Sequence, residues 1–254
     1  MSSSTWTADA LASSAAPLRG RLWRVVEAQA KVSTMKLTDT LEEQAALERL
    51  LDATKPKIPV ECGHLGYLLF TPFRNAPYPF DSRFRRAGSR DGVFYASEEP
   101  DTAIAEAAFY RLLFFAESPE TPWPSNPAEH TVFAVQVATA KAIDLTRTPL
   151  VRDRTSWTHV TDYAPCLDLA DAARDAAVEA IRYESVRDPK ARANVALLTC
   201  RMFARNDAVE RQTWHLHVGR AGVRAVCESP GRSLAFGLEI FANDSRLDPL
   251  HGDR

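Results

Sequence analysis

The sequence lacks any long apolar segment. No run of 18 apolar positions occurs in its 254 residues, so no helix is expected to span a membrane. Residues 1–17 are rich in Ser, Ala and Thr, with neither a basic start nor a continuous apolar stretch, which argues against a signal peptide. We therefore expect a cytoplasmic protein whose residues 1–17 form a disordered tail.

An excess of charge of one sign is also missing. The 31 Lys and Arg residues nearly balance the 33 Asp and Glu residues, and the formal net charge is −2. Such a balance gives no electrostatic reason for nucleic acid or an anionic membrane to be the main partner. A nucleic-acid-binding protein is therefore disfavoured, and no direct nucleic-acid or membrane partner is expected.

Cysteine is scarce and scattered. The four residues Cys62, Cys166, Cys200 and Cys227 contain no CxxC pair, whereas disulfide frameworks and structural zinc sites usually have closer spacing. Reduced, buried thiols are therefore expected. Only His215 and His217 lie close together among the histidines, and no third ligand is near them, so no metal site is predicted.

Helix and strand patterns are both present, but without the regular alternation of parallel α/β proteins. Thr40 and Glu43 form a capping box before a helix that places its apolar residues Leu47, Leu50 and Leu51 on one face. Further elements are expected as helices at 102–115 and 167–181, strands at 92–97, 131–139, 142–145 and 194–201, and a hairpin at 213–228. The prediction is an α+β fold, with an N-terminal helical segment (18–57) packed on the larger domain (58–245).

A first group of polar residues surrounds the strand expected at 92–97. The loop Ser82-Arg-Phe-Arg-Arg-Ala-Gly88 is rich in guanidinium groups, Tyr95 lies on the strand, and Glu106 lies in the following helix. Each of these residues alone would more often belong to a solvated surface.

A second group follows in Tyr183-Glu-Ser185-Val-Arg187 and Asn194. It places a hydroxyl, a guanidinium and an amide around a turn that we expect to connect a helix to a strand. Polar residues at such turns commonly serve only as helix caps.

Taken together, the order of these groups resembles the RES-domain family, which is named for a shared Arg, Glu and Ser. The front of the chain adds similarity in Trp23-Arg-Val-Val-Glu-Ala-Gln29, Leu41-Glu-Glu-Gln44 and Pro72-Phe-Arg74, and the resemblance extends to about Glu228. Two departures stand out. Tyr95 lies further from Arg83 than in compact members, and Phe84-Arg85 replaces the familiar Trp-Asn, so Arg85 is an alternative to Arg83.

The resemblance implies an ADP-ribosyltransferase-like mixed β-sheet core with flanking helices. It implies a toxin of a toxin–antitoxin system that cleaves the nicotinamide–ribose bond of its substrate NAD+, by hydrolysis or phosphorolysis, without a metal. A mono-ADP-ribosyltransferase acting on a host protein is the near alternative, and a non-catalytic nucleotide- or protein-binding module is a further one.

The resemblance also assigns roles to residues. Arg83, Tyr95 and Glu106 are expected to be catalytic, and NAD+ is expected to contact Arg74, Arg85, Ser185, Arg187 and Asn194. The expected partner is a helical DNA-binding antitoxin that occludes the active site. It would dock on an exposed apolar rim of the pocket, which we expect to include the leucines of the front helix.

Overall fold

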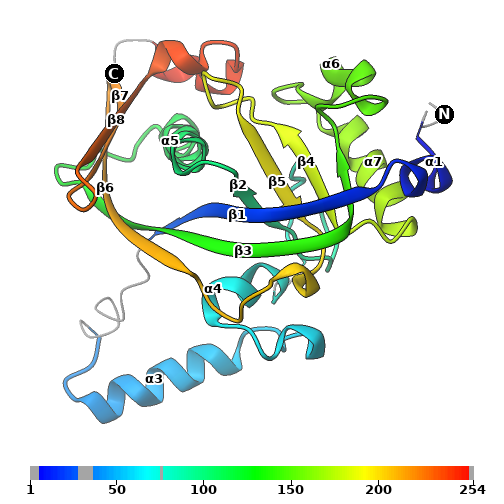
Figure 1. Ribbon diagram of the computed structural model, residues 1–254. Coiled ribbons are helices and arrows are strands. Elements are labelled where there is room, and N and C mark those ends of the chain that lie inside the picture. Colours follow the sequence, from blue (N-terminus) through cyan, green and yellow to red (C-terminus); the bar gives the residue numbers. More distant parts are fainter. Residues whose placement is uncertain (1–5, 28–36, 75–76, 252–254) are drawn as a thin grey trace.

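The protein is built on one mixed sheet of eight strands (Figure 1), and the computed structural model describes residues 6–27, 37–74 and 77–251. The strand order is β1-β2-β5-β4-β3-β6-β7-β8, and an additional β1–β3 pairing joins the first five strands into a ring. All pairings are antiparallel except β3–β4. The strands span Ala16–Glu27, Phe94–Ser97, Ala128–Asp144, Ala180–Glu184, Ala193–Leu197, Glu210–Gly219, Gly222–Cys227 and Arg232–Gly237. This mixed sheet with flanking helices confirms the α+β prediction.

The long strands β1 and β3 form the spine of the sheet. They pair from Ala16 opposite Ala142 to Glu27 opposite His130. On β3, Phe133 faces a core on one side of the sheet while Val132 faces a core on the other, and both are fully buried. The short strand expected at 142–145 is the end of β3 and not a separate element.

Helix α5 (Pro100–Glu117) packs on one face of this sheet, and it confirms the helix predicted at 102–115. Its first-turn proline suits a position where the backbone amide has no helical partner. Fully buried Ile104, Ala108 and Leu112 lie on the side that meets the core. The C-terminal turns η5 (Leu238–Phe241) and η6 (Ser245–Leu250) add Phe241, Leu247 and Leu250 to the same core.

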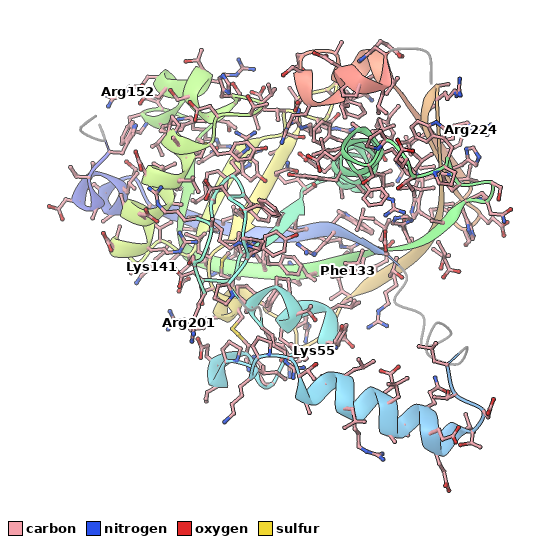
Figure 2. All side chains as sticks on the ribbon, turned by 180° about the vertical axis from the view of Figure 1, so that it is seen from behind. Lys55, Phe133, Lys141, Arg152, Arg201 and Arg224 are labelled. Atoms are coloured by element: carbon pink, nitrogen blue, oxygen red, sulfur yellow. A yellow bond between two sulfur atoms is a disulfide. The ribbon has the colours of Figure 1, made fainter. Side chains whose placement is uncertain are left out.

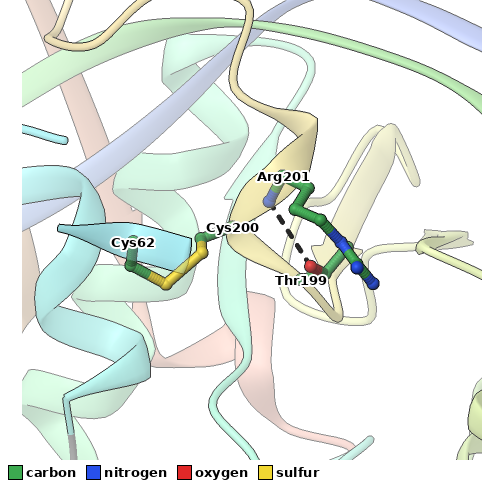
Figure 3. Close-up of a disulfide and its surroundings, with 4 residues drawn as sticks. All are labelled: Cys62, Thr199, Cys200 and Arg201. Atoms are coloured by element: carbon green, nitrogen blue, oxygen red, sulfur yellow. Dashed lines mark hydrogen bonds between the residues drawn. A yellow bond between two sulfur atoms is a disulfide. The ribbon is translucent and has the colours of Figure 1, made fainter. Parts of the chain in front are cut away.

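The opposite face is covered by short elements, two of which are joined by a disulfide. These are η1 (Val60–Cys62), α4 (Tyr67–Phe70), η2 (Thr71–Phe73) and η4 (Cys200–Met202). Cys62 and Cys200 are bonded, although 138 residues separate them in the sequence (Figure 3). The expectation of reduced thiols is therefore wrong for this pair, because folding and not sequence spacing brings η1 against η4. Cys166 and Cys227 are free and buried.

A third hydrophobic core includes Trp6 and Leu11, which belong to the segment expected to be disordered. Helix α1 (Ala8–Ser13) packs on α7 (Ala164–Asp175), next to η3 (Leu150–Asp153) and α6 (Arg154–Trp157). Leu11 is fully buried, and the indole of Trp6 donates to Asp153 at 2.7 Å. The disorder prediction is therefore wrong for residues 6–17, since tertiary contacts order them, while residues 1–5 lie outside the described part.

Two further boundaries differ from the sequence expectation. Residues 16–27 form strand β1 and not a helix, so this part of the N-terminal segment is a member of the sheet. The helix expected at 167–181 ends at Asp175, and strand β4 starts at Ala180 after a left-handed turn residue, Ala177 (φ 52°).

Helix α3 (Leu41–Ala53) confirms the predicted helix and its capping box. It extends away from the sheet (Figure 1), and none of its residues is buried. Lys55, labelled in Figure 2, lies where α3 meets the rest of the protein, with its ammonium 5.8 Å from the Tyr67 ring centroid. Among the described helices, none combines the length and apolarity needed to cross a membrane.

Candidate functional site

A cleft of about 820 Å³ lies between β1, β2 and helix α5. Its walls include the loop at 78–85, the turn residues Val186 and Arg187, Tyr163, and Arg246 from near the end of the chain. This volume lies within the range of small-molecule sites. Most of the predicted site residues line it, namely Arg83, Arg85, Tyr95, Glu106, Arg187 and Asn194.

The Glu106 carboxylate is held by two side chains. Its Oε1 accepts hydrogen bonds from Ser185 Oγ at 2.7 Å and from Asn194 Nδ2 at 2.6 Å. Asn194 is itself oriented by Ser97, whose hydroxyl donates to Asn194 Oδ1 at 2.6 Å from the register-paired position on β2. No side chain in the described part donates to Oε2, so this oxygen is left for a ligand.

Ser185 sits in the turn that joins antiparallel β4 and β5, and not in the helix-to-strand turn expected from the sequence. Its Oγ also accepts from the backbone amides of Arg187 (3.2 Å) and Asp188 (3.1 Å), which fixes the hydroxyl proton toward Glu106. A nucleophilic serine needs an activating base. Here the hydroxyl serves to position the carboxylate.

The Tyr95 side chain is held in place by hydrogen bonds to its hydroxyl group. The hydroxyl is 2.9 Å from Ser82 Oγ and accepts from the backbone amide of Phe84 at 3.0 Å. Burial raises the pKa of the Tyr95 phenol, so it stays neutral in the physiological range. The ring therefore presents a fixed, neutral surface to the cleft.

The two candidate arginines of the loop differ in what they contact. Buried Arg83 donates to the carbonyls of Trp157 (2.7 Å) and His159 (3.0 Å), so the fold already uses its guanidinium. Arg85 lies over the Tyr78 ring at 5.0 Å, and its buried Nε has no partner within the described structure. Arg85 therefore retains the hydrogen-bonding capacity that an anionic ligand needs.

Sequence reasoning missed Arg24 on β1. Its Nη1 donates to the Tyr95 carbonyl at 2.7 Å, and no carboxylate in the described residues forms an ion pair with it. Burial lowers the pKa of Arg24 to about 10, which marks a guanidinium that lacks a compensating anion. The signal was available, because Arg24 is a charged residue within the apolar stretch Leu22 to Val26.

Arg74 does not join the cleft. Its Nη1 bonds Asp52 at 2.6 Å and its Nε donates to the Pro56 carbonyl at 2.6 Å, so it fastens the end of α3. The leucines of α3 are also absent from the cleft wall, which corrects the expectation that they form its rim. The exposed aromatic residues at the cleft are instead Tyr78, Phe80 and Tyr110.

Within the described ranges, no cluster of three or more His, Cys, Asp or Glu side chains could hold a metal ion. His215 and His217 lie on β6 and face Val226 and Arg224 of β7 in the strand register.

The fold and the cleft define an α+β domain with a small-molecule site centred on a carboxylate held by a serine and an asparagine. Comparison with protein families gives a match to the RES domain over residues 58–219. This is more than half of the chain, and the protein therefore belongs to the RES-domain family, as the motifs suggested. Arg24 and Arg246 lie outside the matched range.

Comparison with solved structures found three similar chains. One comes from the crystal structure of the M. tuberculosis MbcT–MbcA toxin–antitoxin complex. It is 13% identical, with a TM-score of 0.46, and the alignment covers 83% of this chain and 90% of that one. Comparison with curated proteins gave no match.

Proposed function

We propose that this protein is the toxin of a toxin–antitoxin system and that it cleaves the bond between nicotinamide and C1′ of ribose in NAD+. The observation that carries the proposal is the Glu106 carboxylate, fixed by Ser185 and Asn194 with one oxygen free in the cleft. Membership of the RES-domain family supports NAD+ as the substrate.

The chemistry suits such a carboxylate. When the C1′–N bond breaks, its electron pair leaves with the nicotinamide nitrogen, which is cationic in NAD+ and neutral in the product. The ribose then carries oxocarbenium-like positive charge, as in glycoside cleavage. Glu106 stabilises that charge at short range. Water bonds to C1′ and releases one proton, giving ADP-ribose, and this balance requires no metal.

The rest of the cleft would bind and orient the dinucleotide. Arg24 and Arg85 would donate hydrogen bonds to the pyrophosphate. Arg83 would instead hold the cleft wall in place through its bonds to backbone carbonyls. The neutral ring of Tyr95 would pack against the nicotinamide or its ribose. We place the activity in the cytoplasm, where NAD+ is available.

The test is an incubation of the purified, antitoxin-free protein with NAD+. Release of nicotinamide with ADP-ribose means hydrolysis, and ADP-ribose 1″-phosphate means phosphorolysis. A labelled protein band means mono-ADP-ribosylation, the near alternative with the same site. If no nicotinamide is released under any of these conditions, the proposed activity is wrong.

Glu106→Gln separates an enzyme from a binding module. We expect nicotinamide release to fall by roughly 10²–10³-fold, since the charge that stabilises the transition state is lost. The affinity for NAD+ should stay nearly unchanged because the shape is kept. Exposed Glu120 lies outside the cleft, so Glu120→Gln is the matched control and should be fully active. A wild-type protein that binds NAD+ but does not cleave it would support the alternative of a non-catalytic binding module.

We further propose that a helical antitoxin covers the cleft through Tyr78, Phe80 and Tyr110, which are 52%, 68% and 53% exposed. Co-expression with a short upstream reading frame should yield a stable complex without activity. Phe80→Ala should weaken the complex, while Val226→Ala, an exposed apolar residue on β7, should not. Equal capture of both variants would contradict this docking site.

A further inference from the structure

The C-terminal turn η6 brings a second group of charges to the cleft. Arg246 lines the cleft wall, and its Nη2 bonds Asp244 Oδ2 at 2.7 Å. Arg187, from the turn after Ser185, bonds the same carboxylate oxygen at 2.7 Å. Asp244 is fully buried, so one carboxylate holds two guanidiniums in place.

These charges are only partly compensated. Arg187 and Arg246 both donate to the carbonyl of Val160, at 2.9 and 3.2 Å. Arg83 donates to the carbonyls of Trp157, at the end of α6, and of His159 in the loop that follows, and its guanidinium lies 4.7 Å from the Tyr163 ring centroid. Carbonyls satisfy N–H groups but do not cancel charge. Three guanidiniums, those of Arg83, Arg187 and Arg246, thus bond to neutral carbonyls of the segment 157–160. Asp244 supplies a negative charge to two of them, Arg187 and Arg246.

One donor in this group has no acceptor. Arg187 is only 3% exposed, and within the described residues its Nη1 is buried without a hydrogen-bond partner. Its guanidinium is held 3.6 Å from the Phe109 ring centroid, so its orientation is fixed. Buried polar atoms in proteins are nearly always hydrogen-bonded, so an unpartnered donor on a residue that lines the cleft needs an explanation, and a bound anion would supply one.

We propose that Arg187 and Arg246, held by Asp244, form a second anion subsite in the cleft that binds a phosphoryl group. A phosphoryl group offers several oxygens, which suit the forked donors of two adjacent guanidiniums. Its source is either a phosphate of the dinucleotide or free phosphate. The subsite deepens the proposed function and rests on it for the identity of the dinucleotide. Its residues are held by Asp244, whereas Arg24 and Arg85 of the same cleft contact Tyr95 and Tyr78.

The test is calorimetric titration of the whole protein with ADP-ribose and, separately, with inorganic phosphate. Arg246→Gln should weaken the affinity for at least one of them about tenfold or more, because a charge-assisted contact is lost. Arg246→Lys, which keeps the charge, should restore part of it. Arg224→Gln is the matched control. Arg224, labelled in Figure 2, is exposed on β7 and is not among the residues that line the cleft.

The two probes identify the source. A loss for ADP-ribose alone assigns the subsite to the dinucleotide, and a loss for inorganic phosphate alone assigns it to free phosphate. If wild type binds neither, or if Arg246→Gln binds both as Arg224→Gln does, the subsite is wrong. Binding is measured without turnover, so Arg246-dependent binding by a protein that releases no nicotinamide would sustain the subsite and refute the proposed activity.

Discussion

Glu106 receives both of its side-chain hydrogen bonds on one oxygen, and the two donors reach it from β5 and from the turn that precedes β5. This arrangement fixes the rotation of the carboxylate and leaves Oε2 without a side-chain donor in the described part of the chain. A carboxylate that acts on a developing charge must be held in place before the reaction, since reorientation would cost part of the stabilisation. Ser185 and Asn194 therefore act through Glu106.

We expect Ser185→Ala and Asn194→Ala each to lower kcat for nicotinamide release by about tenfold or more. A hydrogen bond to a charged group contributes about 1.5–3 kcal/mol. The double variant should lose less than the product of the two effects, because both act on one group. Ser233→Ala, on the exposed side of β8, is the control. Fully multiplicative losses would show that the two residues act independently.

Substitutions of Arg83 and Arg85 should change different properties of the protein. We expect an effect on stability for Arg83 and an effect on NAD+ binding for Arg85. Arg85→Gln should raise KM for NAD+ with little change in stability, since its Nε makes no bond within the described structure. Arg83→Gln should instead lower the free energy of unfolding by about 2–4 kcal/mol, because two carbonyls lose their donor. Urea unfolding and steady-state kinetics on both variants give the answer. The reverse pattern would assign the pyrophosphate to Arg83.

The sequence could indicate which residue types belong to the site, but not their partners. Arg83, Arg85, Tyr95, Glu106, Ser185 and Asn194 were all named in advance from motif order. The motifs did not show that Arg83 is bonded to loop carbonyls or that Arg74 binds Asp52 outside the cleft. These hydrogen-bond partners are far away in the sequence, and folding brings them next to the arginines.

At the scale of elements, the sequence predicted those helices and strands whose own residues show a clear local pattern. The capping box of α3, helix α5 and the β6–β7 hairpin were all recognised. Strand β1 was missed because its apolar residues Leu22, Trp23, Val25 and Val26 do not alternate with polar ones, and the adjacent Leu22 and Trp23 are both buried. Helix α1 was missed because its stability comes from packing on α7 and not from its six residues.

The turn η6 should make a measurable contribution to stability through Asp244. Burial opposes ionisation of this carboxyl, but the Arg246 hydrogen bond and the Arg187 charge outweigh it and lower the pKa of Asp244. A lowered pKa gives stability that is present above the unfolded value near 4 and is lost as pH falls through the folded value. Asp244→Asn should cost about 3–5 kcal/mol at pH 7, because it leaves Arg187 buried without its anion.

The pH dependence distinguishes this effect from a general packing defect. Urea unfolding between pH 7 and pH 3 should show a steeper loss of stability for wild type than for Asp244→Asn, so the two curves converge in acid. Asp175→Asn, at an exposed position of α7, should follow wild type throughout. A constant gap between wild type and Asp244→Asn at all pH values would contradict the role of ionisation.

At the scale of the whole molecule, the cleft is assembled from both ends of the chain. Strand β1 supplies Arg24, helix α5 supplies Glu106, the turn after β4 supplies Arg187, and η6 supplies Arg246. The family match at 58–219 contains the carboxylate and its two donors, whereas Arg24 and Arg246 lie on either side of it.

The disulfide between Cys62 and Cys200 should stabilise the whole molecule, because it links segments 138 residues apart. A cross-link that closes a long loop restricts the unfolded chain, and native disulfides typically contribute about 2–5 kcal/mol. We expect a dithiol reductant to lower the free energy of unfolding by this amount in urea titrations. The double variant Cys62→Ser/Cys200→Ser should match the reduced protein and not respond to the reductant, since Cys166 and Cys227 are free in both. Four reactive thiols in the unfolded, unreduced protein would show that the bond does not form.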